Sequence, residues 1–277
     1  QHDFRQFGMS EPATISIGVA FSESGDLHLG QLQKHADLAM YAAKRPSSPK
    51  CVIYSEGMGE LGALVANRAI NAVFEAIRDS SLIEMTYQAV MRLPMVNKEY
   101  VEALTRIRLH GELIRPDAIF PIVQARKLDA EFDLSVIRSI ARDMESGRLA
   151  PGQGVSINLS APSIVNAHVV DAMLALVRSQ PARKIVVEIT ETALITQMET
   201  ASANIAQLRE AGALVALDDF GSGYSSLRYL ATMPVDLVKF DISMIRLLEH
   251  GEARQKLILE EIAGMVLTAG YELVAEG

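Results

Sequence analysis

Residues 184–220 read KIVVEITETALITQMETASANIAQLREAGALVALDDF, and this stretch decides the fold. It predicts a strand over KIVVEIT, a helix over METASANIAQLREAG that is closed by Gly212, and a second strand over ALVALDDF. Two short apolar runs joined through a helix are typical of a parallel strand–helix–strand unit. The fold is therefore expected to be of the α/β class.

The same alternation continues on both sides of this unit. Five further apolar runs predict strands: IEMTYQAV (83–90), YVEALTRI (100–107), GVSINLS (154–160), VDLVKFD (235–241) and YELVAEG (271–277). Helices are expected over SIVNAHVVDAMLALVRS (163–179) and ARQKLILEEIAGMVLTAG (253–270). Repeated units of this kind predict a TIM-like (β/α)8 barrel. Since seven strands are visible and such a barrel has eight, we expect the barrel to be clipped at its C-terminal end.

The first 57 residues form a shorter pattern of the same type. TISIGVAF (14–21), QLQKHADLAMYAAKR (31–45) and CVIYS (51–55) predict strand, helix and strand. Three elements bury too few apolar side chains to stand alone, so we expect 1–57 to be the end of an α+β domain that is truncated upstream. A helical run over 58–81 then connects it to a second domain over 82–277.

Composition excludes several classes of protein. The chain has 277 residues, 49% hydrophobic residues, no Trp and a net charge of −8, which disfavours binding to a DNA or RNA duplex. No apolar run approaches the length of about 20 residues that a membrane span needs, so no direct membrane insertion is expected. One cysteine, Cys51, cannot form an intrachain disulfide and is expected to be a buried small hydrophobe. These features favour a cytoplasmic protein, with any inner-membrane tether placed upstream of Gln1.

Metal-ligating or charged side chains stand in the C-terminal parts of successive apolar runs. They are Glu102, Asn158, Glu188, Asp218, Asp219, Lys239 and Glu276. In a parallel barrel the C-terminal strand ends converge on one face, so these side chains are expected to meet there. Any single carboxylate at a strand end is more often a helix cap, but Glu102 and Glu188 lie in apolar contexts where an unpaired carboxylate is costly to bury. The set therefore predicts an oxygen-ligated site for Mg²⁺, Mn²⁺ or Ca²⁺, and the adjacent Asp pair suggests two ions.

The segment DDFGSGYSSL (218–227) joins a predicted strand to the next helix. Gly221, Ser222 and Gly223 permit tight turns there, so a flexible lid is expected. The triplet DFG also occurs in protein kinases, but this chain has no glycine-rich strand loop ahead of it and no HRD motif. The kinase interpretation is therefore set aside.

These motifs resemble a known family when they are taken together. VEAL with Arg106, SINLS, EITET, LDDFGSGYSSL, PVDLVKFD and LVAEG resemble the successive motifs of the EAL-domain cyclic-di-GMP phosphodiesterases, over about Leu82 to Gly277. TISIGVAF followed by ADLAMYAAKR resembles the final third of a GGDEF domain, the diguanylate cyclase module that often precedes EAL domains. The GGDEF signature itself is absent from this sequence, so no cyclase activity is assigned to it.

The resemblance implies hydrolysis of cyclic-di-GMP to linear pGpG with two Mg²⁺ or Mn²⁺ ions, while Ca²⁺ is expected to bind but inhibit. By the same analogy Glu102, Asn158, Glu188 and Asp218 hold one ion, and Asp218, Asp219 and Glu276 hold the second. Lys239 is expected to position the attacking water or to stabilise charge, and the catalytic set is Glu102, Asp219, Lys239 and Glu276. The substrate is expected to contact Gln88, Leu104, Arg106 and Asp241, and Glu191 is expected to anchor the lid through Ser222. The family also implies a homodimer.

The sequence departs from the family pattern at a few positions. Ala89 replaces the usual proline, Thr105 the usual leucine and Gln124 the usual glutamate, and none of the three is an expected metal ligand. Two alternatives remain open. The chain could be a catalytically weak or inactive cyclic-di-GMP receptor that signals through a protein partner, or part of a bifunctional protein whose cyclase residues lie upstream.

Overall fold

The computed structural model describes residues 16–22, 29–43, 50–55, 58–94, 97–190, 197–221, 230 and 232–276. By its internal contacts the chain divides into two units, Gln1–Asn71 and Ala72–Gly277. The division falls within the long helix α2 (Met58–Arg78), which covers most of the expected connecting segment. Within the described residues, no helix combines the length and the apolar character needed to cross a membrane.

The first unit contains the predicted strand–helix–strand pattern. Strand β1 (Ile17–Val19) pairs in parallel with β2 (Cys51–Ile53), and α1 (Leu29–Ala43) makes the crossover between them. Gly18 lies against α1 so closely that a Cβ there would collide with the carbonyl oxygen of Ala36. Cys51 is exposed, so the expectation that it is buried was wrong. The reason is strand alternation, which turns Val52 inward and Cys51 outward.

The second unit is built on an eight-stranded sheet in the order β10-β9-β8-β7-β6-β4-β3, with β5 paired to β4. Neighbouring strands from β4 to β10 run parallel, whereas β3 and β5 are antiparallel to β4. All seven strands expected in this region are present, and the short β5 is an additional, unexpected strand. The strands are β3 (Ile83–Arg92), β4 (Asn97–Leu109), β5 (Glu112–Ile114), β6 (Val155–Leu159), β7 (Ile185–Thr190), β8 (Leu214–Phe220), β9 (Leu237–Phe240) and β10 (Glu272–Ala275).

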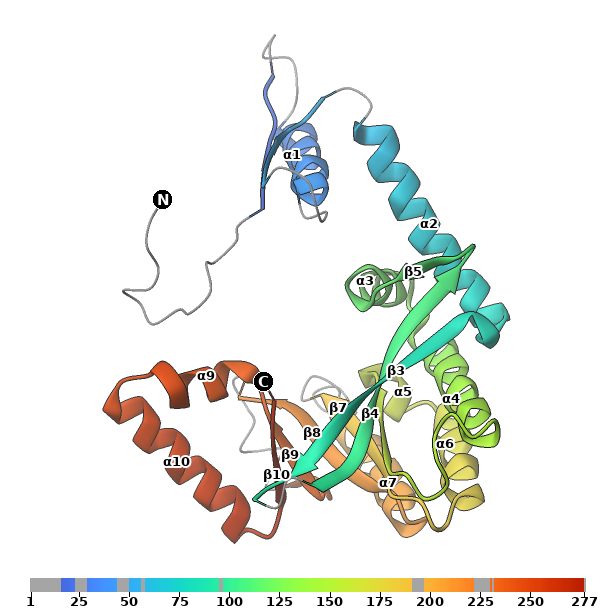
Figure 1. The fold of residues 1–277 in the computed structure, drawn as a ribbon, viewed down its shortest axis with the longest axis vertical. Coiled ribbons are helices and arrows are strands. Elements are labelled where there is room, and N and C mark those ends of the chain that lie inside the picture. The colour runs from blue at the N-terminus through green and yellow to red at the C-terminus, as the bar shows by residue number, and fades with distance from the viewer. Residues whose placement is uncertain are drawn as a thin grey trace. The chain divides into compact units, whose positions relative to one another are not determined.

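The sheet curls so that its two edge strands approach each other (Figure 1). Tyr100, Val186, Ala216 and Leu237 form one buried cluster on the inner face, and Val90 of β3 and Val274 of β10 pack against it. The guanidinium of Arg92 at the end of β3 also lies 4.0 Å from the carboxylate of Glu272 on β10. The curled, mainly parallel sheet is consistent with the expected TIM-like barrel.

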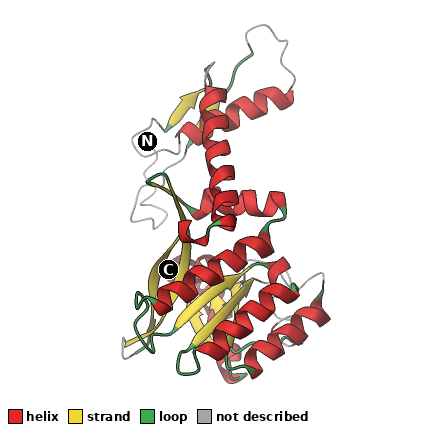
Figure 2. Ribbon diagram, turned by 90° about the vertical axis from the view of Figure 1, so that its right-hand side faces the viewer, coloured by secondary structure: helices red, strands yellow, loops and turns green. Residues whose placement is uncertain are grey.

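Helices cover the outer face of this sheet and bury the larger hydrophobic core (Figures 1 and 2). Ser139 of α4 donates to the carbonyl oxygen of Ile83 at 3.0 Å, which fixes this helix on β3. The short 3-10 helix η2 (Ser80–Leu82) precedes β3. The remaining helices are α3 (Pro116–Arg126), α4 (Asp129–Glu145), α5 (Ala161–Ile164), α6 (Ala167–Ser179), α7 (Met198–Glu210), α9 (Ile242–His250) and α10 (Ala253–Thr268).

Two local features differ from a regular parallel barrel. Strands β3 and β4 are joined by a short connection, which can reverse the chain but cannot make the crossover that parallel neighbours need. The helix expected over 163–179 is divided into α5 and α6, because Asn166 ends the first turn and caps the second helix by accepting from the backbone N–H of His168 at 3.0 Å.

Candidate active site

Inward-facing side chains of successive strands build the candidate site. In each strand the residue two positions before the site residue also faces inward: Tyr100 precedes Glu102, Val186 precedes Glu188, and Leu237 precedes Lys239. The apolar members of these pairs form the cluster that fills the inside of the sheet. The charged members therefore form the next layer along the parallel strands. Glu188 and Lys239 lie in the C-terminal halves of β7 and β9, whereas Glu102 lies in the middle of the longer β4.

Lys239 lies at the centre of this layer and is only 1% exposed. Its Nζ lies 2.7 Å from Glu276, 2.8 Å from Glu188, 3.2 Å from Asp218 and 3.6 Å from Glu102. Although burial opposes the charged form, the nearby carboxylates of Glu188, Asp218 and Glu102 raise the pKa of Lys239 above its usual value. One permanently charged ammonium therefore holds four carboxylates together.

Glu188 is the most deeply buried of these carboxylates, at 1% exposure. Burial raises the pKa of Glu188 to about 7, and the charges of Glu102 and Asp218 act in the same direction against the attraction of Lys239. Its Oε2 accepts from Lys239, but Oε1 has no hydrogen-bond partner among the residues that the structure describes. A buried carboxylate oxygen of this kind is suited to a cation.

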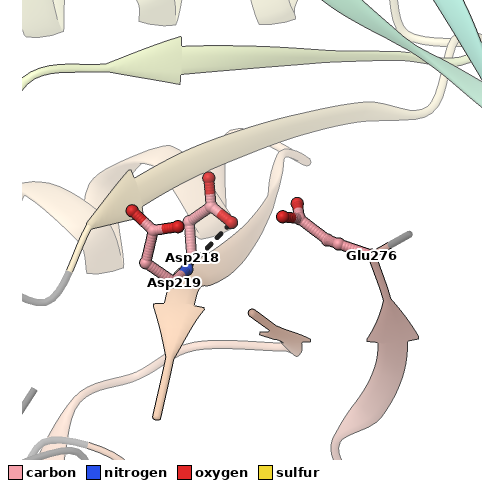
Figure 3. A group of neighbouring side chains, drawn as sticks. All are labelled: Asp218, Asp219 and Glu276. Carbon is pink, nitrogen blue, oxygen red and sulfur yellow. Dashed lines mark hydrogen bonds between the residues drawn. The ribbon is translucent and has the colours of Figure 1, made fainter. Parts of the chain in front are cut away.

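A bulge in β8 brings two consecutive carboxylates into the site (Figure 3). The register with β9 shifts between Leu217 and Phe220, and Asp219 takes a left-handed backbone conformation with φ of 56°. The backbone N–H of Asp219 donates to Asp218 Oδ1 at 3.0 Å. Ligand oxygens of Asp218, Asp219 and Glu276 lie within 4.8 Å of one another. Burial and the charge of Asp218 raise the pKa of Asp219, and burial raises the pKa of Glu276 despite Lys239.

The residue after β8 needs to be glycine. Gly221 has a φ of 99°, and a Cβ at this position would collide with the side chain of Met244 on α9. Phe220 stacks on Phe240 of β9 with ring centroids 5.6 Å apart, which fixes the end of β8 directly after the bulge. The backbone that presents the two aspartates is therefore held from both sides.

Asn158 joins the site through Glu102. Its Nδ2 donates to Glu102 Oε1 at 3.1 Å, which leaves the amide oxygen available as a ligand. Two residues further on, Ser160 is held by the buried Asp133 of α4, which accepts from the backbone N–H at 2.9 Å and from the hydroxyl at 2.7 Å. Sequence reasoning missed Asp133. The available signal was a carboxylate that stands directly between the apolar residues Phe132 and Leu134.

The residues expected to bind substrate lie beside this cluster or near it in the chain. Gln88 of β3 is exposed and is the register partner of Glu102, while Leu104 and Arg106 follow Glu102 on β4 and are half-buried. Arg106 Nη1 donates to the carbonyl oxygen of Thr105 at 2.8 Å. Asp241 caps α9 by accepting from the backbone N–H of Ser243 at 2.9 Å. Glu191, Ser222 and Gly223 lie outside the described residues.

The donor set fits a divalent cation. Carboxylates of Glu102, Glu188, Asp218, Asp219 and Glu276 outnumber the one ammonium that faces them, and Glu188 Oε1 has no described partner. Carboxylates packed this closely repel one another unless cations lie between them. All-oxygen ligation favours Mg²⁺, Mn²⁺ or Ca²⁺ over zinc or copper.

A curled, mainly parallel sheet with an acidic cluster at its strand ends is consistent with a metal-dependent enzyme on a TIM-like fold, and comparison with known proteins gives the family. The family model described as EAL domain matches residues 70–277, so the chain belongs to the EAL domain family. The cyclic di-GMP phosphodiesterase PdeB of Shewanella oneidensis is 32% identical over 268 residues, which cover 95% of this chain and 31% of that protein. Several curated relatives align with 95% of this chain, and the chain spans only 31% to 43% of the length of those relatives.

Solved structures agree with this family. The PaMucR phosphodiesterase in complex with c-di-GMP has a TM-score of 0.64 and 25% identity, and the match covers 75% of this chain and 86% of that one. The S helix–GGDEF–EAL portion of LapD from Vibrio cholerae has a TM-score of 0.69 over 94% of this chain and 63% of that one. Its identity of 21% makes it a comparison of fold alone.

Proposed function

We propose that this chain hydrolyses cyclic di-GMP to linear pGpG with the help of two Mg²⁺ or Mn²⁺ ions. The observation that carries the proposal is the buried Lys239 surrounded by carboxylates at the C-terminal strand ends, with Glu188 Oε1 unpaired among the described residues. Similarity to a relative named as a cyclic di-GMP phosphodiesterase supports the same substrate. Hydrolysis forms one P–O bond to the oxygen of water, breaks one ester P–O bond and leaves a proton on the departing ribose oxygen.

The ions would be held by two overlapping sets of oxygens. Glu102, Asn158, Glu188 and Asp218 would hold the first, and Asp218, Asp219 and Glu276 the second, with Asp218 shared. Two such ions lower the pKa of a bound water and neutralise charge on the reacting phosphoryl group. The hydrogen bond from Asn158 to Glu102 and the bulge at Asp219 orient these oxygens before any ligand arrives.

Lys239 has a second role in this proposal. Its ammonium stays protonated at neutral pH because of its carboxylate neighbours, so it holds their positions and contributes positive charge near the reacting phosphate. Arg106 would bind a ligand phosphate through its planar guanidinium. Gln88, Leu104 and Asp241 would contact the rest of the nucleotide, and Gly221 would begin a lid that Glu191, Ser222 and Gly223 complete.

The finer organisation of the chain belongs to the same proposal. Residues 1–57 would be the C-terminal part of a GGDEF-like domain, which the parallel β1–α1–β2 unit and the fold likeness to a GGDEF–EAL structure support. Residues 58–81 would connect it to an EAL domain over 82–277. We further expect that the chain forms a homodimer, that Ca²⁺ binds but inhibits, and that the protein acts in the cytoplasm, with any membrane tether lying upstream of Gln1.

The direct test is to incubate the purified chain with cyclic di-GMP and Mg²⁺ or Mn²⁺ and to separate the nucleotides by chromatography. We expect pGpG to accumulate, and EDTA or Ca²⁺ to stop the reaction. Asp218→Asn should lower the rate by more than the roughly 10–100-fold that loss of an outer-shell partner causes. Glu84→Gln is a matched control, because Glu84 pairs with Arg108 on the surface and is not in the cluster.

Calorimetric titration of cyclic di-GMP into the same samples distinguishes an enzyme, which hydrolyses the ligand, from a receptor, which only binds it. Binding without product in Mg²⁺ and Mn²⁺ would replace the proposal by a receptor function. Absence of both binding and product would contradict the assignment of the cluster to cyclic di-GMP. An active Asp218→Asn variant would show that the carboxylates are not the catalytic group.

A further inference from the structure

Three buried polar atoms in the second unit have no hydrogen-bond partner among the described residues. They are the hydroxyl of Tyr100 on β4, the hydroxyl of Ser156 on β6 and Oε1 of Glu188 on β7. Tyr100 and Glu188 are each 1% exposed and Ser156 is fully buried. Leaving such a group unpaired costs free energy comparable to a lost hydrogen bond, so buried polar side chains are nearly always paired with protein or with water.

The three residues face the inside of the curled sheet from the neighbouring strands β4, β6 and β7. Ser156 is the register partner of Glu102 on one side and of Val186 on the other. Val186 packs in the same buried cluster as Tyr100, and Glu188 follows Val186 by two positions on the same face of β7.

The absence of a side chain at Gly154 lets β6 pack closely against Tyr100. Gly154 lies beside Tyr100, since a Cβ added to it would come within 2.8 Å of the Tyr100 Cβ. Below Tyr100, Lys184 places its ammonium 5.3 Å from the ring centroid and pairs with Glu99 at 2.9 Å. The region is therefore bounded by charged groups below and by the acidic cluster above.

We propose that the inside of the sheet holds a buried structural water that bridges Tyr100 Oη, Ser156 Oγ and Glu188 Oε1, beneath the proposed metal site. A buried water needs two to four polar partners, and these three side chains supply that number. Each hydroxyl can both donate and accept, whereas the carboxylate oxygen accepts and has two lone pairs. One lone pair of Glu188 Oε1 can thus face the water while the other faces a cation, so this site does not compete with the metal.

The test is a double-mutant cycle on the whole chain with Tyr100→Phe and Ser156→Ala, read as the thermal unfolding midpoint in EDTA. If both hydroxyls bind the same water, each single variant lowers the midpoint, and the double variant loses clearly less than the two losses added together. If the hydroxyls are unpaired in a dry interior, removing either one raises the midpoint, because an unsatisfied buried group has been removed. A raised or unchanged midpoint, or strictly additive losses, would overturn the proposal.

Two matched variants set the scale. Tyr87→Phe removes a hydroxyl that donates to Asp143 at 2.7 Å, and Ser139→Ala removes one that donates to the carbonyl oxygen of Ile83 at 3.0 Å. Tyr100→Phe and Ser156→Ala should change the midpoint in the same direction as these two. A crystal structure at a resolution that resolves ordered water gives an independent readout. Density within hydrogen-bond distance of all three atoms is expected, and an empty or apolar interior there would refute the site. Neither readout depends on hydrolysis, so this inference and the proposed function can fail separately.

Discussion

Replacement of Lys239 by methionine removes a buried ammonium that faces four carboxylates. At an effective dielectric constant of about 20, the measured separations of 2.7–3.6 Å give roughly 5–6 kcal/mol of attraction for each pair. Repulsion among the carboxylates and the cost of burying the ions cancel most of that sum. The expected net loss is therefore about 3–5 kcal/mol, the usual effect of removing one partner of a buried ion pair.

This loss should be visible in thermal unfolding measured by circular dichroism in EDTA. For a unit of 150–250 residues, each kcal/mol lowers the midpoint by about 2–4 °C, so Lys239→Met should unfold roughly 6–20 °C below the wild type. Added Mg²⁺ should restore more stability to Lys239→Met than to the wild type, because the cation takes the place of the missing positive charge.

Lys184→Met is the matched control for this experiment. Lys184 also pairs with two carboxylates, Glu99 at 2.9 Å and Glu272 at 3.5 Å, but its side chain is 22% exposed. Ion pairs of this kind are worth about 0–1 kcal/mol, so its midpoint should change little. Equal losses for the two variants in EDTA, or a Lys239→Met protein as stable as the wild type, would refute the electrostatic argument.

Three further predictions concern pH, backbone strain and metal removal. Burial raises the pKa of Asp133 to about 6 against the hydrogen bonds from Ser163 and Ser160, so the folded state binds more protons than the unfolded state between about pH 4 and 6. The raised pKa of Asp133 adds at most about 3 kcal/mol to the free energy of unfolding, and this stabilisation is present below pH 4 and lost as pH rises past 6. In urea unfolding, the free energy of unfolding of the wild type minus that of Asp133→Asn should therefore fall over this range. Gly221→Ala should destabilise by about 1–3 kcal/mol in urea. In a Met244→Ala background the same substitution should cost less but not nothing, because the collision is relieved while the positive φ remains strained; no cost in that background would assign the whole effect to the collision. EDTA should lower the thermal midpoint of the wild type and leave that of Asp218→Asn nearly unchanged, and equal shifts would argue against a metal at this site.

Much of the fold could be predicted from the sequence, because strand residues buried on both faces form continuous apolar runs that stand out between helices. KIVVEIT and ALVALDDF illustrate this, since β7 and β8 lie within those runs. The position of Lys239 among carboxylates was predicted from its place late in an apolar run, because the C-terminal ends of parallel strands converge on one face. Residue types and spacing were enough for that conclusion.

Other features depend on contacts that a pattern does not contain. The left-handed conformation of Asp219 arises where β8 and β9 change register, and register is a property of two strands rather than of one segment. Asp133 reaches Ser160 across 27 positions of the chain, from a helix that carries none of the strand-end motifs. The antiparallel direction of β3 follows from the short connection to β4, which apolar periodicity alone does not distinguish.

The ion pairs of Arg92, Glu99, Lys184 and Glu272 have a consequence for the response of the second unit to ionic strength. They link β3 and β4 to β7 and β10 at the end of the sheet opposite the acidic cluster, and the edge strands β3 and β10 are not hydrogen-bonded neighbours. Because the side chains of these pairs are 22% to 51% exposed, 1 M salt should screen them, whereas the contacts of Lys239 are shielded from salt by burial. The two ends of the same sheet should therefore differ in salt sensitivity. In 1 M salt the contacts between the edge strands β3 and β10 should weaken, while the acidic cluster keeps its geometry.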